Sequence, residues 1–147
     1  MEFGKIKDKH ITAAAELEAA CLDTAWTEAQ IKEAAAREDT LYLSATEGEE
    51  LCAVASCVFS AFEAMIENVA TAEEHRRKNA AAGLLRLIEA EAANRGLEQI
   101  SLEVASRNAA AIALYTKAGF KRAGIRKGFY RRQNDDALVM IKELDAQ

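Results

Sequence analysis

The stretch EVASRNAAAIALYTKAGF, residues 103–120, decides the fold. The residues from Gln99 to Val104 alternate between polar and apolar side chains, which predicts a strand with one buried face. Asn108 is a favoured helix cap and Gly119 a favoured helix end, so the sequence predicts a helix between them. A strand that runs directly into a helix is typical of folds in which helices cover a sheet.

Two side chains in this stretch have the chemistry of a base and an acid. Glu103 lies on the polar face at the carboxyl end of the predicted strand, where sheet proteins place their sites, and Tyr115 lies two turns into the helix. A carboxylate and a phenol can act as general base and general acid. Each also has a structural interpretation, Glu103 as a solvated strand residue and Tyr115 as a core aromatic with its hydroxyl at the edge.

Outward from this stretch, hydrophobic spacing predicts about seven strands and four helices. The predicted strands are Glu2 to Lys7, Thr40 to Thr46, Leu51 to Phe59, Ala64 to Thr71, Gln99 to Val104, Phe120 to Gly128 and Ala137 to Glu143. The predicted helices are Lys9 to Leu22, Glu28 to Arg37, Asn79 to Asn94 and the one that begins at Asn108. The first helix rests on the spacing of Ala14, Leu17 and Cys21. The expected fold class is α/β of the mixed α+β kind, with helices on a mixed sheet.

The size and composition of the chain predict one globular domain. The chain has 147 residues and a mass of 16.0 kDa, which fits a single domain over residues 1–147. Its longest apolar run, Ala109 to Tyr115, is far shorter than the roughly 20 residues that span a bilayer, and its first ten residues lack a signal-peptide pattern. We therefore expect a cytoplasmic protein that does not enter a membrane.

Charge and cysteine content exclude several classes of partner. The net charge of -5 argues against a nucleic-acid or anionic-membrane binder and permits a basic partner. Cys21, Cys52 and Cys57 form no CxxC pair, so a reducing compartment is expected and no metal site is predicted.

A basic segment precedes the third predicted helix. Arg76, Arg77 and Lys78 crowd a helix N-terminus whose dipole is already positive, which is unfavourable unless an anion binds there. Backbone N–H groups, the dipole and these side chains together would cradle a pyrophosphate. The alternative is a solvated basic turn that water and salt screen.

Four short elements, taken with the order of strands and helices, resemble one family. They are Ala25-Trp26-Thr27-Glu28, Asn68-Val69-Ala70, residues 103–120, and Asp136 to Met140. Together they resemble the GNAT superfamily of acetyl-CoA-dependent N-acetyltransferases, and within it the bacterial RimI-type ribosomal-protein-alanine N-acetyltransferases. The resemblance covers nearly the whole chain and implies a mostly antiparallel central sheet with four flanking helices.

The resemblance implies direct acetyl transfer in a ternary complex. A backbone N–H near Val69 to Thr71, where that strand splays from its neighbour, would polarise the thioester carbonyl of acetyl-CoA. Glu103, directly or through a water, would take a proton from the α-ammonium of a protein N-terminus, and Tyr115 would protonate the departing thiolate. The implied acceptor is a basic ribosomal protein, with no nucleic acid involved and the oligomeric state open.

The resemblance also implies two sets of binding residues. Those for acetyl-CoA are Val69, Ala70, Thr71, Arg76, Arg77, Lys78, Asn79, Ala80, Ala81 and Asn108. Those for the acceptor are Trp26, Tyr130 and Arg131. Trp26 has an equally good structural interpretation, because it precedes a capping box formed by Thr27 and Gln30 and can pack as a hydrophobic staple on Ile31.

One departure from the family pattern concerns the coenzyme. The family motif Q/R-x-x-G-x-G/A reads Arg76-Arg77-Lys78-Asn79-Ala80-Ala81 here, so Asn79 replaces a glycine. Asparagine tolerates positive φ better than most residues, but its side chain obstructs close approach of a phosphate. Two alternatives therefore stay open: an acetyltransferase for a small amine or a lysine, and a GNAT-fold binding protein that is catalytically impaired.

Overall fold

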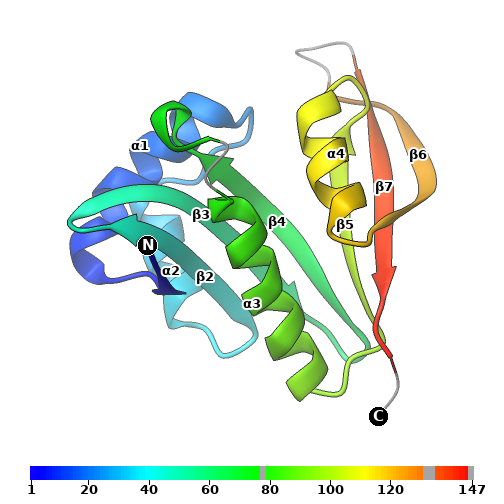
Figure 1. Cartoon of the computed structure of the whole chain (residues 1–147), viewed down its shortest axis with the longest axis horizontal. Helices are drawn as coiled ribbons and strands as arrows, with labels where there is room; N and C mark the ends of the chain where they lie inside the picture. The colour runs from blue at the N-terminus through cyan, green and yellow to red at the C-terminus, as the bar shows by residue number, and fades with distance from the viewer. Residues whose placement is uncertain (77–78, 131–134, 146–147) are drawn as a thin grey trace.

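A seven-stranded mixed sheet with helices on both faces forms the centre of the molecule (Figure 1). The computed structural model describes residues 1–76, 79–130 and 135–145, with the backbone alone for 128–130 and 135. The strands are β1 (Glu2–Lys5), β2 (Thr40–Glu47), β3 (Glu50–Phe59), β4 (Glu63–Thr71), β5 (Gln99–Ala105), β6 (Lys121–Tyr130) and β7 (Asp135–Glu143). Their order in the sheet is β1-β2-β3-β4-β5-β7-β6, and every neighbouring pair is antiparallel except β4 and β5.

The described part of the chain contains four α-helices and two short 3-10 helices. The α-helices are α1 (Ile11–Cys21), α2 (Glu28–Ala36), α3 (Ala80–Asn94) and α4 (Ala109–Lys117), and the 3-10 helices are η1 (Asp8–His10) and η2 (Glu73–His75). The predicted fold class is therefore confirmed. The first helix starts later than predicted, at Ile11, because residues 8–10 form the tighter η1 turn with no side-chain cap. Likewise β7 begins at Asp135, inside the polar segment before the predicted strand.

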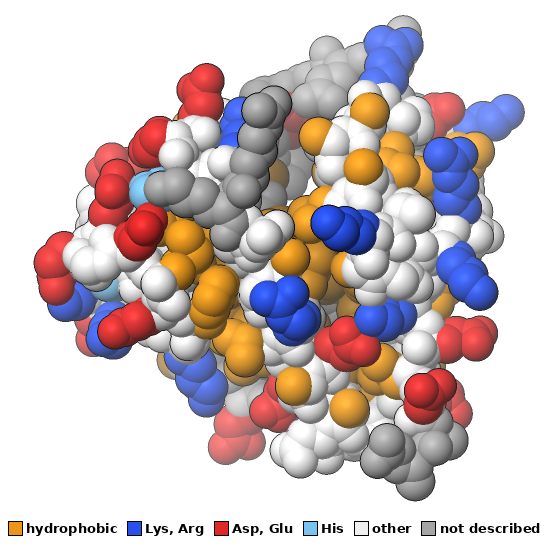
Figure 2. Space-filling model, in the orientation of Figure 1, with side chains coloured by type: hydrophobic (Ala, Val, Ile, Leu, Met, Phe, Trp, Pro, Cys, Tyr) orange, Lys and Arg blue, Asp and Glu red, His pale blue; other side chains and the backbone are white. Residues whose placement is uncertain are grey.

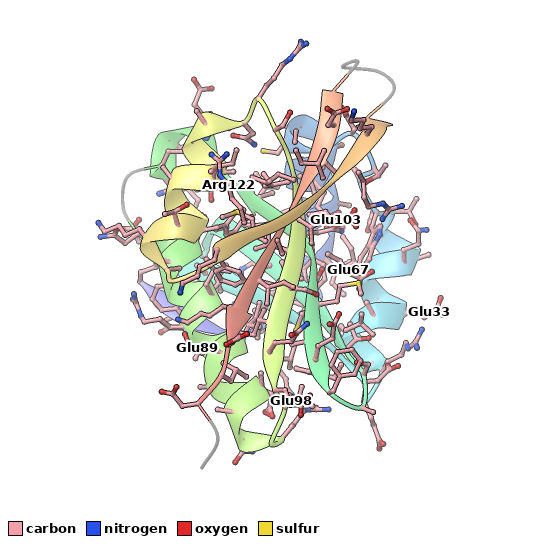
Figure 3. All side chains as sticks on the ribbon, turned by 90° about the vertical axis from the view of Figure 1, so that its right-hand side faces the viewer. Glu33, Glu67, Glu89, Glu98, Glu103 and Arg122 are labelled. Carbon is pink, nitrogen blue, oxygen red and sulfur yellow. The ribbon has the colours of Figure 1, made fainter. Side chains whose placement is uncertain are left out.

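Two apolar cores lie on opposite faces of the sheet. The larger one joins α3 and α4 to the sheet, and the smaller one joins α1 and α2 to it through residues such as Tyr42 and Val54. Figure 3 shows this layering edge-on. Strand β2 is buried on both faces, since Leu41 and Leu43 point to the larger core and Tyr42 points to the smaller one. Burial on both faces extends from Thr40 to Thr46 and includes the hydroxyl side chains of Thr40, Ser44 and Thr46.

The capping box predicted for α2 is confirmed. Thr27 Oγ1 accepts a hydrogen bond from the Gln30 backbone N–H at 3.2 Å, and the Thr27 backbone N–H donates to Gln30 Oε1 at 2.8 Å. Both groups would otherwise be unsatisfied at the helix start. The box fixes where α2 begins and therefore where the preceding Trp26 lies.

Strands β4 and β5 diverge soon after they meet. Within the described residues they pair at three positions, from Glu63 with Gln99 to Met65 with Ser101. The Glu63 carboxylate closes this narrow end, because it accepts hydrogen bonds from Gln99 Nε2 at 2.8 Å and Ser101 Oγ at 2.9 Å. Beyond Met65 the strands separate and leave room for a ligand between them.

A β-bulge lies on β4 where the separation begins. Ser56 of β3 pairs with Asn68 and Cys57 pairs with Ile66, so Glu67 is the extra residue on the β4 side. Bulges bend a strand and re-aim its side chains. None of the helices in the described ranges is long and apolar enough to span a membrane.

Candidate active site

The space between β4 and β5 is a cavity of about 420 Å³. It adjoins a second cavity of about 670 Å³ that extends to the start of α3. The two cavities share Val69 of β4, Asn108 at the cap of α4 and Tyr115 of α4, so they form one continuous cleft. Glu103 lines the first cavity. Residues as far apart in the sequence as Cys21 and Tyr115 therefore meet around one space.

The predicted coenzyme residues that the structure describes line this cleft. On the side of the larger cavity these are Val69, Ala70, Thr71, Arg76, Asn79, Ala80, Ala81 and Asn108. Arg77 and Lys78 lie outside the described residues. The prediction thus grouped residues that are close in space, although their contacts with a coenzyme stay a prediction.

Asn79 adopts the conformation expected of the glycine it replaces. Its φ of 61° and ψ of 22° are left-handed, and it is the non-glycine residue with positive φ among those described. Its carbonyl accepts the Gly83 N–H at 3.0 Å, while its side chain caps nothing. The first turn of α3 therefore keeps backbone N–H groups for another acceptor, and it contains no acidic residue.

Glu103 has a partner that the sequence did not reveal. Arg126 Nη1 of β6 donates to Glu103 Oε1 at 2.6 Å, with 30% of the Glu103 side chain and 58% of the Arg126 side chain exposed. The two residues come together because β5 and β6 both pair with β7. The guanidinium orients the carboxylate without burying it.

Tyr115 and Asn108 each serve the fold and line the cleft. Tyr115 is 7% exposed and packs edge-on against Phe120, with ring centroids 5.9 Å apart. Asn108 Oδ1 accepts the Ala111 N–H at 3.1 Å, which confirms the predicted cap of α4. Both the structural and the site interpretation of Tyr115 are consistent with this placement.

Trp26 lies outside this cleft. It packs with the smaller apolar core that contains Ile31, as the staple interpretation predicts, and its ring centroid is 6.2 Å from that of Tyr42. It also lines a separate cavity of about 300 Å³. Arg131 and the side chain of Tyr130, the other predicted acceptor contacts, lie outside the described residues.

A buried carboxylate that the sequence did not reveal joins α1 to β2, β4 and the segment before α2. Glu18 of α1 is fully buried and accepts hydrogen bonds at 2.9 Å from the Trp26 N–H and from Asn68 Nδ2, and a further one from the Tyr42 hydroxyl. Burial, followed by the hydrogen bond to Glu18, raises the pKa of Tyr42 above its ordinary value. The available signal was its spacing, because Glu18 follows the buried Ile11 and Ala14 on one helix face.

Glu67 is a second carboxylate in the cleft. It lines both the cavity that contains Glu103 and the cavity that contains Trp26. No hydrogen bond or ion pair joins it to another described residue, and partial burial raises the pKa of its carboxyl. Figure 3 shows Glu67, Glu103 and Glu33 on the same side of the molecule, from β4, β5 and α2.

A mixed sheet whose β4 and β5 diverge around a cleft is a fold found among N-acetyltransferases. The chain belongs to the acetyltransferase (GNAT) family, whose model matches residues 11–120. This confirms the resemblance that the sequence motifs carried.

Similar proteins include ribosomal protein bS18-alanine N-acetyltransferases. The one from Salmonella typhimurium strain LT2 is 34% identical over 105 residues, which cover 70% of this chain and 71% of that protein. The one from Escherichia coli K12 is 38% identical over 80 residues, so the match spans about half of each protein, 53% and 54%. The crystal structure of the ribosomal-protein-S18-alanine N-acetyltransferase from Escherichia coli superposes with a TM-score of 0.87 at 27% identity, covering 99% of this chain and 95% of that one.

Proposed function

We propose that this protein transfers the acetyl group of acetyl-CoA to the N-terminal α-amine of a protein, and that its acceptor is a ribosomal protein that begins with alanine. The similarity to bacterial bS18-alanine N-acetyltransferases supports the acceptor class. Such an acceptor is basic, which suits the net charge of -5 of this protein. We propose that the reaction takes place in the cytoplasm, with neither a nucleic acid nor a membrane as partner.

The observation that carries the proposal is the position of Glu103 and Tyr115 in one cavity. Glu103 reaches it from β5 and Tyr115 from α4. A base and an acid on different elements can act on the two ends of one reacting group, the attacking amine and the leaving sulfur. Their meeting in the space that the divergence of β4 and β5 opens makes acyl transfer the best-supported chemistry.

The residues at the other end of the cleft fit a coenzyme with a pyrophosphate. The first turn of α3 has uncapped N–H groups and no acidic residue, and Arg76 lies beside it. We propose that residues 76–81, including Arg77 and Lys78, hold the pyrophosphate. Val69, Ala70, Thr71 and Asn108 would hold the remainder of the coenzyme along β4.

When bound, acetyl-CoA supplies a thioester carbonyl that an amine can attack. In the proposed mechanism a backbone N–H near Val69 donates to the carbonyl oxygen as negative charge develops there. Glu103 takes the ammonium proton through the oxygen that Arg126 leaves accessible, directly or through one water. The Tyr115 hydroxyl would give its proton to the departing sulfur as the carbon–sulfur bond breaks, and the second proton that the attacking nitrogen loses would pass through solvent to restore the phenol. No step uses a covalent acyl-enzyme.

The acceptor end of the cleft is proposed to be acidic. Glu67 and Glu103 line one cavity, and Glu33 and Trp26 line the adjacent one with Glu67. Carboxylates there would attract an α-ammonium and basic side chains of the acceptor. Tyr130 and Arg131 remain proposed acceptor contacts on sequence grounds.

The first experiment is a calorimetric titration with acetyl-CoA, followed by acetylation of a peptide that begins with alanine. We expect binding at about 100 µM or tighter, which corresponds to about 5.5 kcal/mol. Acetylation of the free N-terminus should exceed that of internal lysines and of free polyamines. Preferred acetylation of polyamine or lysine would favour the small-amine alternative. Coenzyme binding without transfer to any acceptor, or no binding at millimolar coenzyme, would favour an impaired binding protein.

A further inference from the structure

A histidine, a cysteine and a carboxylate meet beside the coenzyme loop, outside the residues used above. His75 ends η2 and directly precedes Arg76, Cys52 lies near the start of β3, and Glu47 ends β2. His75 is 5% exposed and Cys52 is fully buried, while 46% of the Glu47 side chain is exposed. The three residues come from three separate elements, and none of them lies in a CxxC or similar motif.

The polar atoms of the three residues lie close enough together for a zinc site. His75 Nδ1 lies 3.3 Å from Glu47 Oε2, and Cys52 Sγ lies 3.9 Å from the same oxygen. All three potential ligand atoms lie within 4.8 Å of one another. Zinc bonds of about 2.0–2.3 Å in a tetrahedron place neighbouring ligand atoms about 3.3–3.8 Å apart, so a small adjustment of Cys52 brings the set to coordination distance.

The other ring nitrogen of His75 has the environment of a metal-bound histidine. Nε2 lies 3.3 Å from Glu50 Oε2, on the side of the ring opposite Glu47. In metal sites the nitrogen that does not bind metal commonly faces a carboxylate, which fixes the ring orientation. Glu50 therefore occupies the position of the supporting carboxylate, while Nδ1 lies 3.3 Å from Glu47 Oε2.

The charge around His75 also favours a cation. Glu47, Glu50 and Glu74 surround one imidazole, which leaves an excess of carboxylates around the ring. Figure 2 shows acidic side chains gathered along the edge where the β2–β3 turn lies, at the left of the view. A dication would neutralise this excess.

We propose that Glu47, Cys52 and His75 bind a zinc ion, with a water as the fourth ligand on the exposed side of Glu47. A thiolate, an imidazole and a carboxylate form the mixed sulfur, nitrogen and oxygen set that zinc accepts, whereas Mg²⁺ and Ca²⁺ prefer oxygen alone. On binding, the Cys52 thiol loses its proton to solvent as the zinc–sulfur bond forms, and no electron is transferred. The ion would tie η2 to β2 and β3 immediately before Arg76.

The test begins with metal-free protein titrated with Zn²⁺ by calorimetry and with Co²⁺ by absorbance. We expect one ion per chain and a sulfur-to-cobalt charge-transfer band. Cys52→Ser should remove this band, and Cys57→Ser is the matched control because Cys57 is a buried cysteine on the same strand. A band that persists in Cys52→Ser, or that Cys57→Ser removes, would overturn the assignment.

Exposed carboxylates provide a second test that does not disturb the core. Glu47→Gln should weaken Zn²⁺ binding more than about 10-fold, and Glu50→Gln about 10-fold. Glu49→Gln is the control, because Glu49 lies in the same turn and pairs with Lys9 at 2.9 Å instead. Absence of stoichiometric Zn²⁺ binding to the unsubstituted protein, or equal affinity in Glu47→Gln and Glu49→Gln, would refute the site. These readouts are independent of acetyl transfer.

Discussion

Glu18 and Glu103 are carboxylates in two regions that share β4, and their surroundings differ. Glu18 is fully buried and accepts hydrogen bonds from α2's leading loop, β2 and β4. The side chain of Glu103 is 30% exposed and forms an ion pair with Arg126 across the sheet. A buried carboxylate whose two oxygens both accept hydrogen bonds from the protein holds helices and strands in place. A carboxylate with one oxygen exposed to solvent can act on a ligand.

The largest expected effect is on the Glu18 side of this comparison. Glu18→Leu leaves three donors without an acceptor, namely the Trp26 N–H, Asn68 Nδ2 and the Tyr42 hydroxyl. We expect the free energy of unfolding to fall by about 3–5 kcal/mol, measured by urea denaturation. Glu16→Leu, at an exposed position of the same helix, is the control. If the free energy of unfolding falls no further than in this control, then Glu18 does not hold α1 against β2, β4 and the segment before α2.

Glu103→Gln should have the opposite profile. We expect kcat/KM for an alanine-initiated peptide to fall about 100-fold, because a base is lost, while the free energy of unfolding changes by under about 0.5 kcal/mol. Steady-state kinetics and urea denaturation of the same preparation give both values. An unchanged kcat/KM would show that Glu103 is not the base. A large fall in the free energy of unfolding would show that Glu103 has a structural role like that of Glu18.

Asn79 extends the comparison to the coenzyme end of the cleft. Asn79→Gly keeps the left-handed backbone and removes the side chain, so acetyl-CoA should bind several-fold more tightly by calorimetry. Asn79→Asp is the matched control of the same size, and its added charge should weaken binding of the anionic coenzyme. Equal affinities in all three proteins would mean that the first turn of α3 does not contact the pyrophosphate.

The smallest expected effect concerns the pH dependence of Glu67. Its folded pKa is raised by partial burial, so the stability this residue contributes is present below its unfolded pKa and is lost as pH rises through the folded pKa. Glu67→Gln should therefore be more stable than the unsubstituted protein at pH 7, by under about 1 kcal/mol given solvent screening, and equally stable near pH 4. Thermal denaturation at the two pH values measures the difference, with Glu98→Gln at the far end of β5 as control (Figure 3). If the stability difference between Glu67→Gln and the unsubstituted protein is the same at both pH values, it does not arise from ionisation of Glu67.

Local sequence signals predicted the elements, and long-range contacts explain what was missed. Thr27 and Gln30 act within one turn, so their capping box was readable, as was the strand from Gln99. Cys21 was expected on the buried stripe of the first helix, yet it is exposed and Glu18 is buried, because Tyr42 and Asn68 supply its partners from 24 and 50 residues away. No helical periodicity encodes such partners.

The grouping of the candidate site residues could be predicted to a similar extent, while their roles stay predictions. Glu103 and Tyr115 were chosen because one motif contains both, and the structure places them in one cavity. Arg126 was missed because its contact with Glu103 depends on the register of β5 and β6 against β7. Glu47, Cys52 and His75 were missed for the same reason, since three elements bring them together.

We expect the short pairing between β4 and β5 to divide the motions of the molecule as well. Within the described strands, three residue pairs join the β1–β4 part of the sheet to the β5–β7–β6 part. Amide hydrogens on β4 that face the cleft have no acceptor on β5, so we expect them to exchange with solvent through small local fluctuations. Those hydrogen-bonded between β2 and β3 should exchange only when that part of the sheet unfolds. The two parts should therefore exchange as separate cooperative units, and a ligand that fills the opening should slow exchange in both at once.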